Sequence, residues 1–263
     1  MKLNYINKFT MAALALSLGI FACEKKKEIL APWDTVGPGT EFAQIRIMHA
    51  ATNFRAITGQ ADSLHFFVNG AKINNTRMSF GGVWPAQTPT TYTSVPAGNV
   101  DLRVSVGGIV NIDSIPITTL KLNLAAGERY SFMLTDSLLN ASKDSSRIFV
   151  RDSFPTPLNG RIGLRFINGL TDTAGKRIDL WSARRNANLY ANIPYGSISS
   201  FSNQPFINIA DTLIIRRAGT MQEFARINTI TFANQKVYTI FLRGDVLLST
   251  GAKARTLTWV TNR

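Results

Sequence analysis

One pattern of residues occurs twice in this chain, in the same order, and this internal repeat limits what the chain can fold into. The matching segments, with the first copy before the second, are 45–52 and 164–171, 64–67 and 178–181, 79–81 and 194–196, 122–134 and 230–242, and 147–150 and 255–258. The number of residues between matching segments of the two copies changes from 119 to 108 along the chain, and the order of the segments stays the same. We therefore expect two copies of one domain.

Within each copy, apolar and polar residues alternate with a period of two, which is typical of strands with one buried face. In residues 101–106, for example, Leu102, Val104 and Val106 are expected to share one face. Each copy offers about seven or eight short strands separated by turn residues. We predict an all-β chain of two tandem immunoglobulin-like antiparallel β-sandwiches, with a closed eight-stranded barrel as the alternative for each copy.

The segment 153–160 joins the copies and holds Pro155 and Pro157, so it is short and stiff. We predict a first domain over 43–155 and a second, diverged copy over 156–263, meeting end to end with limited freedom.

In residues 237–242 both faces of the strand carry apolar groups. Either the second copy buries an extra surface against the first, or it offers a patch to another protein.

The N-terminus has the anatomy of a signal peptide. Lys2 and Lys8 precede a mostly apolar region of eleven residues, 11–21, and Cys23 follows as the only cysteine of the 263 residues. About 20 apolar residues are needed to span a bilayer, so this stretch is too short to remain as a transmembrane helix. An ordinary secretory signal with an incidental cysteine is the alternative to a lipid attachment site.

Ile20 to Cys23 resembles a bacterial lipobox, which implies cleavage before Cys23 and acylation of its thiol, although Phe21 is bulkier than the usual residue there. We predict a lipoprotein signal peptide over 1–22, and a lipidated cysteine with a flexible tether over 23–42. The breaker-rich tether would span about 25 Å. With Cys23 acylated, no thiol remains for a disulfide.

The first copy resembles the bacterial domain of unknown function family numbered 4397. The segments that carry the likeness are 46–50, 66–70, 80–81, 92–98, 102–104 and 124–127. It covers residues 43–151 well and the second copy more loosely. Where the family often has an acidic residue this chain has His65, and Asp179 keeps the acid in the second copy. The resemblance implies a secreted or lipid-anchored envelope protein without an agreed activity, similar in style to lipoproteins of the Bacteroidota.

The positive charge is concentrated in the second copy. The formal net charge is +13, or +11 without the two lysines of residues 1–22. Residues 24–155 hold 13 basic and 11 acidic residues, and residues 156–263 hold 14 and 5. Two arginine pairs, Arg184–Arg185 and Arg216–Arg217, are candidates for binding phosphate or carboxylate groups of lipopolysaccharide or acidic glycan. The alternative role for these arginines is a solvated basic surface that aids solubility. No motif in the sequence points to nucleic-acid binding.

Catalytic patterns are weak. Two histidines, His49 and His65, are too few for a zinc site without cysteine, and no Gly-x-Ser-x-Gly elbow is present. Glycoside hydrolysis needs a pair of carboxylates, and the candidates for such a pair are Asp101, Asp113, Glu128 and Asp136. Trp84 lies on a long loop, where it either offers a platform to a sugar or partner or, in the favoured interpretation, caps the core.

We therefore predict a non-enzymatic, lipid-anchored protein of the outer membrane, facing the periplasm or the surface, that serves in binding, adhesion or as a scaffold. Its expected partners are the membrane through the lipid and an acidic glycan, lipopolysaccharide or another envelope protein, with no metal and no cofactor. The alternatives are a glycan-active hydrolase and an acid-binding module in the second domain.

Overall fold

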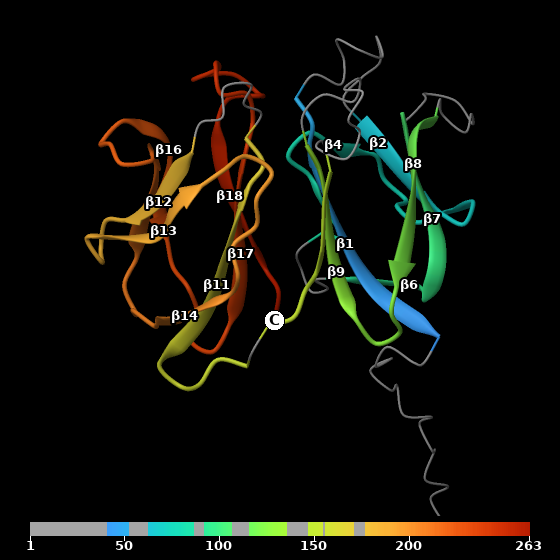
Figure 1. Cartoon of the computed structure of the whole chain (residues 1–263), viewed down its shortest axis with the longest axis horizontal. Coiled ribbons are helices and arrows are strands. Elements are labelled where there is room, and N and C mark those ends of the chain that lie inside the picture. Colours follow the sequence, from blue (N-terminus) through green and yellow to red (C-terminus); the bar gives the residue numbers. More distant parts are fainter. Residues whose placement is uncertain are drawn as a thin grey trace, which may run out of the picture. The chain divides into compact units, whose positions relative to one another are not determined.

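The computed structural model describes residues 41–52, 63–86, 92–106, 116–135, 147–154, 156–170 and 177–263. Throughout these ranges the regular elements are strands, as Figure 1 shows. No helix in the described part of the chain is long and apolar enough to cross a membrane. The predicted signal peptide, Cys23 and nearly all of the predicted tether lie outside the described residues.

The strands of residues 42–151 form two sheets. The first, here called the first inner sheet, contains β10 (Arg147–Arg151), β9 (Arg129–Thr135), β1 (Phe42–Ala50) and β5 (Val83–Trp84) in that order, with β6 (Thr93–Pro96) also on β1. The first outer sheet contains β3 (Ala71–Lys72), β2 (Ser63–Val68), β7 (Gly98–Val106) and β8 (Pro116–Leu124), with β4 (Met78–Ser79) on β2. Buried side chains of both sheets, among them Ile47, Phe66 and Leu102, form the core between them.

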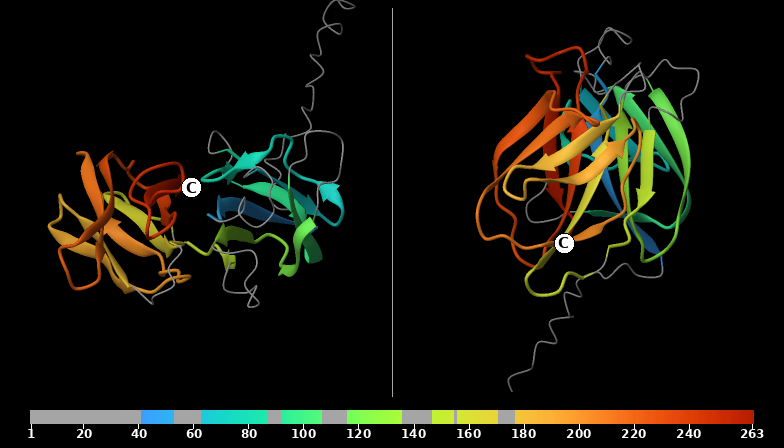
Figure 2. Two further views of the ribbon diagram at one scale, coloured as in Figure 1. Left: turned by 90° about the horizontal axis from the view of Figure 1, so that it is seen from above. Right: turned by 60° about the vertical axis from the view of Figure 1, so that its left-hand side comes forward.

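The strands of residues 161–261 repeat this arrangement. The second inner sheet contains β14 (Ser202–Pro205), β11 (Arg161–Asn168), β17 (Val237–Arg243) and β18 (Thr256–Thr261), and the second outer sheet contains β13 (Ala187–Ile193), β12 (Ile178–Ser182), β15 (Asp211–Arg217) and β16 (Glu223–Ile230). Leu164, Leu180 and Ile240 belong to the core between them. In the left view of Figure 2, the blue to green strands and the orange to red strands gather in separate sets.

The all-β sandwich prediction is confirmed, and the described strands of each half divide into two sheets. Antiparallel pairs dominate, but each inner sheet also contains one parallel pair, β1 with β9 and β11 with β17. The repeated segments occupy equivalent places, because Ile45 pairs with Tyr130 and Leu164 pairs with Tyr238. The exact domain boundaries, at Pro155 and the residue after it, stay a prediction.

The last repeat match, 147–150 with 255–258, is wrong by two residues. Phe149 pairs with Phe132 on β9, and Trp259 pairs with Ile240 on β17, so Phe149 and Trp259 are the equivalent residues. A shift of two residues leaves each side chain on the same face of its strand, so the apolar pattern does not reveal the error. One consequence is that Asp152 and Asn262, just after β10 and β18, are equivalent.

The two inner sheets pack against each other through a third apolar cluster. Its buried members, from β1, β9, β10, β11, β17 and β18, are Met48, Ala50, Met133, Ile148, Ile167, Phe241 and Val260. Residues 38–263 accordingly form one compact unit. The end-to-end contact expected from the linker is wrong, and the two apolar faces of residues 237–242 are explained by the extra surface buried against the first half.

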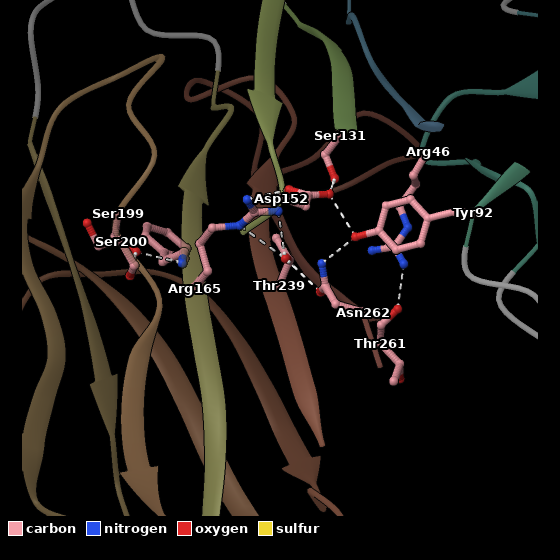
Figure 3. Close-up of polar contacts among 11 residues, drawn as sticks. Arg46, Tyr92, Ser131, Asp152, Arg165, Ser199, Ser200, Thr239, Thr261 and Asn262 are labelled. Atoms are coloured by element: carbon pink, nitrogen blue, oxygen red, sulfur yellow. Dashed lines mark hydrogen bonds and ion pairs between the residues drawn. The ribbon is translucent and has the colours of Figure 1, made fainter. Parts of the chain in front are cut away.

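A buried ion pair lies in this interface, as Figure 3 shows. The guanidinium of Arg165 donates through Nη1 to Oδ1 of Asp152 at 2.6 Å, with side chains that are 2% and 0% exposed. The other carboxylate oxygen, Oδ2, accepts from Tyr92 OH at 2.7 Å and from Ser131 Oγ at 2.5 Å. Arg165 also donates through Nη2 to Thr239 Oγ1 at 3.0 Å. Both charged groups therefore have hydrogen-bond partners within the protein.

Equivalent residues of the two copies continue this network. Asn262 accepts from Thr239 Oγ1 at 2.9 Å and donates through Nδ2 to Tyr92 OH at 2.8 Å. Arg46, the equivalent of Arg165, donates to the carbonyl oxygen of Thr261 at 2.6 Å. The guanidiniums of Arg46 and Arg165 lie 4.3 and 4.5 Å from the ring centroids of Tyr92 and Phe201, which occupy equivalent places before β6 and β14.

Replacing Asp152 with alanine should strongly destabilise the protein, because it leaves the Arg165 charge buried without a partner. Breaking a buried pair in this way costs about 3–5 kcal/mol, which urea denaturation measures directly. The control is Arg151→Gln, which breaks the exposed ion pair with Glu128 and should change stability little. Equal effects of the two substitutions would contradict a structural role for the buried pair.

Stability should fall at alkaline pH through Tyr92. Burial and then the negative charge of Asp152 raise the pKa of this phenol above its ordinary value, against smaller opposing effects of Arg46 and Arg165. The folded protein thus keeps a proton that an unfolded tyrosine loses near pH about 10. The contribution is complete below that pH and is lost above it. Denaturation midpoints measured from about pH 9 upward should decline less steeply in Tyr92→Phe, and an unchanged slope would refute the assignment.

Candidate functional site

The solvent-facing side of the first outer sheet carries polar residues in rows. Because successive side chains of a strand point to opposite faces, residues 100, 102 and 104 of β7 enter the core, while residues 99, 101 and 103 face away from it. The register of β7 with β8 places Asn99 opposite Asn123 and Asp101 opposite Lys121. The sheet thus presents two amides, a carboxylate and an ammonium side by side.

A groove of about 490 Å³ runs over these rows. Its lining residues are Asn69, Asn99, Val100, Asp101, Lys121, Leu122 and Asn123. Asn69 comes from the turn between β2 and β3, where it adopts a positive φ of 48°. Its Oδ1 accepts from the backbone N of Asp101 at 2.9 Å, and its own N donates to the carbonyl of Asp101 at 3.0 Å. These two bonds hold the turn against β7 and form one wall of the groove.

The groove residues keep their hydrogen-bonding capacity for a ligand. Asn99, Asp101, Lys121 and Asn123 are all exposed, and within the described ranges their side chains form no hydrogen bond or ion pair. Amides both donate and accept, a carboxylate accepts and an ammonium donates, so together they complement hydroxyl groups. The site can therefore bind a polyhydroxylated molecule such as a glycan.

The sequence does not point to three of these residues, Asn99, Lys121 and Asn123, and it offers Asp101 either as a catalytic carboxylate or as a solvated strand residue. A signal was present, since polar residues alternate with core residues along both 99–103 and 119–123. The pairing of these two strands, which brings the residues into rows, was not predicted.

Trp84 lies on the two-residue strand β5 rather than on a long loop. It pairs with Ile47 of β1 and packs, partly buried, against the core of the first half. It is not among the residues that line the groove. A contact with a ligand or partner stays a prediction for Trp84.

The two arginine pairs do not come together. Arg184 and Arg185 occupy the turn that follows β12, whereas Arg217 pairs with Ile178 at the other end of the same strand. The pairs are thus separated by the length of β12. A single oxyanion therefore does not bridge both pairs.

Each arginine of the first pair bonds to the chain itself. Arg184 donates through Nη2 to the carbonyl of Ala210 at 3.2 Å, and Arg185 donates through Nη2 to the carbonyl of Pro205 at 2.6 Å. Burial lowers the pKa of Arg185, against the opposing charge of Asp211. Both side chains therefore already contribute to the structure around the turn.

In the second pair, the guanidinium of Arg216 lies 4.3 Å from the ring centroid of Trp181 and its Nη1 contacts Met221 Sδ at 3.5 Å. Arg217 is exposed at the end of β15. Ligand binding by these four arginines stays a prediction.

The remaining candidates for chemistry are dispersed. His49 is fully buried on β1 and accepts from Ala51 N at 3.4 Å, while His65 lies on β2 in the other sheet. Glu128 accepts from Arg151 Nε at 2.8 Å. Asp113, Asp136 and Cys23 lie outside the described residues. In the part of the chain that the structure describes, no group of three or more His, Cys, Asp or Glu is placed to hold a metal ion.

Comparison with solved structures gives distant likenesses only. The C-terminal domain of AlgF from P. aeruginosa is 10% identical, with 40% of this chain and 98% of that chain covered and a TM-score of 0.26. A CBM26 module of Eubacterium rectale Amy13K in complex with maltoheptaose is 10% identical, with 84% of this chain and 97% of that chain covered and a TM-score of 0.22. A putative polysaccharide binding protein (DUF1812) from Bacteroides thetaiotaomicron is 9% identical, with 84% of this chain and 96% of that chain covered and a TM-score of 0.24. Such TM-scores are too low to bear on fold or function. No curated protein matches the chain.

The family comparison is decisive. The profile of the family described as domain of unknown function (DUF4397) matches residues 43–181, more than half of the chain. The match begins in β1, covers the whole first half and extends through β11 into β12. The expected resemblance is thereby confirmed, and the chain belongs to the DUF4397 family.

Proposed function

We propose that this protein is a lipid-anchored protein of the cell envelope that binds a glycan in the groove of the first outer sheet without reacting with it. The observation that carries the proposal is the groove itself, with two amides, a carboxylate and an ammonium whose hydrogen-bonding groups are not used within the described chain. Sugar hydroxyls donate and accept, so they match this mixture better than a purely apolar or purely charged ligand does.

The groove favours binding over glycan cleavage. Glycoside hydrolases use two carboxyl groups on either side of the scissile bond. Among the described lining residues Asp101 is the one carboxylate, and it stands opposite Lys121 rather than a second acid. The groove residues therefore supply recognition without the acid and base pair that hydrolysis requires.

Lipid attachment at Cys23 would hold this binding surface at the outer membrane. Two or more acyl chains make attachment stable, since each buried methylene contributes about 0.8 kcal/mol. The tether would then let the compact unit of residues 38–263 stand off the membrane. A binding protein of this kind keeps its ligand near the cell without a transmembrane segment.

Glycan binding can be measured with the mature chain carrying Cys23→Ser, screened against a panel of polysaccharides and then titrated by calorimetry. Removing two ligand hydrogen bonds at about 1 kcal/mol each should weaken binding about 10-fold to 30-fold in the double variant Asn99→Ala, Asn123→Ala. The matched control is Asn188→Ala, an exposed strand asparagine on the second outer sheet. Absence of binding across the panel, or equal affinity in the double variant, would refute the groove as a glycan site.

Acylation is tested by growing cells with radioactive palmitate and recovering the protein from the membrane fraction. The label should be present in the natural chain and absent from Cys23→Ala, because the thiol is its point of attachment. Phe21→Ala should raise the fraction of the protein that is cleaved and labelled, since it restores a small residue before the cleavage site. Label that persists in Cys23→Ala would overturn the lipid anchor while leaving the groove untouched.

A further inference from the structure

The face of the first outer sheet that bears the groove ends in a group of buried hydrogen-bond donors. We call Ser63, His65, Arg103 and Ser105 the donor cluster. Ser63 and His65 lie on β2 and alternate with core residues, as Arg103 and Ser105 do on β7. The register places His65 directly opposite Ser105 and Arg103 opposite Phe67, and Ser63 lies two residues from His65 on the side away from Arg103, so the four side chains form a row on the face that points away from the core.

Each member of the donor cluster has a buried polar atom without a partner. These atoms are Ser63 Oγ, His65 Nδ1, Arg103 Nε and Ser105 Oγ. Ser105 is 0% exposed and Ser63 is 8% exposed. Buried polar groups in folded proteins nearly always form hydrogen bonds, and an unmet one requires an explanation. Four such atoms in a row on one face indicate that hydrogen-bond partners are missing there, above all beside the facing pair His65 and Ser105.

The missing partner must be an acceptor. Lys72 Nζ lies 3.5 Å from His65 Nε2, and because an ammonium only donates, Nε2 accepts and the ring proton resides on Nδ1. Arg103 Nε is a donor, and both serine hydroxyls are free to donate. Asn74 lies near enough to His65 to raise its pKa through weak hydrogen bonding, but its Oδ1 already accepts from Phe66 N at 2.7 Å, and His65 Nδ1 has no well-formed hydrogen bond.

The charges around the donor cluster favour a negative ligand. Lys72 pairs with Phe67 at the edge of the sheet, and Arg103 lies over the Phe67 ring at 4.1 Å. Burial first, and then the positive charges of Lys72 and Arg77, lower the pKa of His65, against a smaller opposing effect of Asn74. Among the described residues of the same face, Asp101 is the acid nearest to Arg103 along β7, two residues away and opposite Lys121, while Asp62, which precedes Ser63 in the sequence, lies outside the described residues. No ion pair within the described residues neutralises Lys72, Arg77 or Arg103.

We infer that the donor cluster binds an oxyanion, either a carboxylate or a sulfate group, and that the ligand of the adjacent groove is therefore an acidic glycan. The glycan part rests on the proposed function, whereas the oxyanion site rests on the four donors alone. Asp101 in the groove and Ser105 in the cluster are four positions apart, a distance of about 13 Å along β7. A single oligosaccharide can extend from one to the other. The acidic group is thus recognised by the first half of the chain, not by the arginine pairs of the second.

Calorimetry with the mature chain carrying Cys23→Ser compares a uronic acid tetrasaccharide, its neutral methyl ester, a sulfated tetrasaccharide and sodium sulfate. One of the two acidic sugars should bind at least about tenfold more tightly than the neutral ester, and the difference should shrink with salt. Histidine side-chain NMR supplies an independent readout, because the chain has only two histidines. The signal missing in His65→Gln should shift with the acidic sugar.

Two substitutions locate the effect. Ser105→Ala and Arg103→Met should each remove most of the preference for the acidic sugar and leave the affinity for the neutral ester unchanged. Ser105→Ala should also be at least as heat-stable as the natural chain, because it deletes an unmet buried hydroxyl, so loss of fold will not obscure the result. The matched control is Arg216→Met, which removes an arginine over an aromatic ring on the second outer sheet.

The outcomes separate the two claims. Equal affinity for acidic and neutral sugars, or a preference abolished by Arg216→Met instead, would overturn the oxyanion site and leave the glycan groove standing. A His65 shift with sulfate in a protein that binds no sugar would support the oxyanion site and overturn the glycan function. No response to any of the four probes would overturn both.

Discussion

The buried charge pair between Asp152 and Arg165 determines how the two halves of this protein fit together. A carboxylate that has lost its water must keep a cation and hydrogen-bond donors around it, and Asp152 receives them from Arg165, Tyr92 and Ser131. The surrounding apolar cluster, by contrast, tolerates small shifts because dispersion and apolar burial are not directional. Apolar packing thus brings the inner sheets together, and the ion pair fixes their alignment.

The repeat meets itself at this interface, and one difference between the copies makes the contact possible. Asn262 occupies the place equivalent to Asp152, where its amide donates to Tyr92 and its oxygen accepts from Thr239. The Tyr92 hydroxyl has a single proton, and it donates that proton in its hydrogen bond to Asp152. A second carboxylate at 262 would face that hydroxyl without a donor and would add a like charge. Divergence of the copies therefore suits the joined pair better than two identical halves would.

Because the inner sheets cover each other, the proposed glycan recognition would fall to the outer sheets and the loops. The first outer sheet has both features expected of a recognition surface, namely a groove with unused polar groups and a cluster of donors without an acceptor. The second outer sheet differs, since Asp179 accepts from the backbone of Asn192 and Gly219 where the first copy has His65. The acid of the second copy is used in hydrogen bonds to the backbone, whereas His65 of the first copy lies 3.5 Å from Lys72 Nζ through Nε2 and keeps Nδ1 without a hydrogen bond.

The sequence by itself determined the all-β class and the repeat, because alternation of apolar residues records directly which face of a strand is buried. It did not determine the strand register at the end of each copy, since a shift of two residues preserves that alternation. Nothing in the alternation marks Arg46, Asp152 and Arg165 as buried. Only the tertiary structure decided that they are buried, that the arginine pairs lie apart, and that Asn99 faces Asn123. The reason is that burial of a second sheet face and the pairing of strands depend on contacts between residues far apart in the chain.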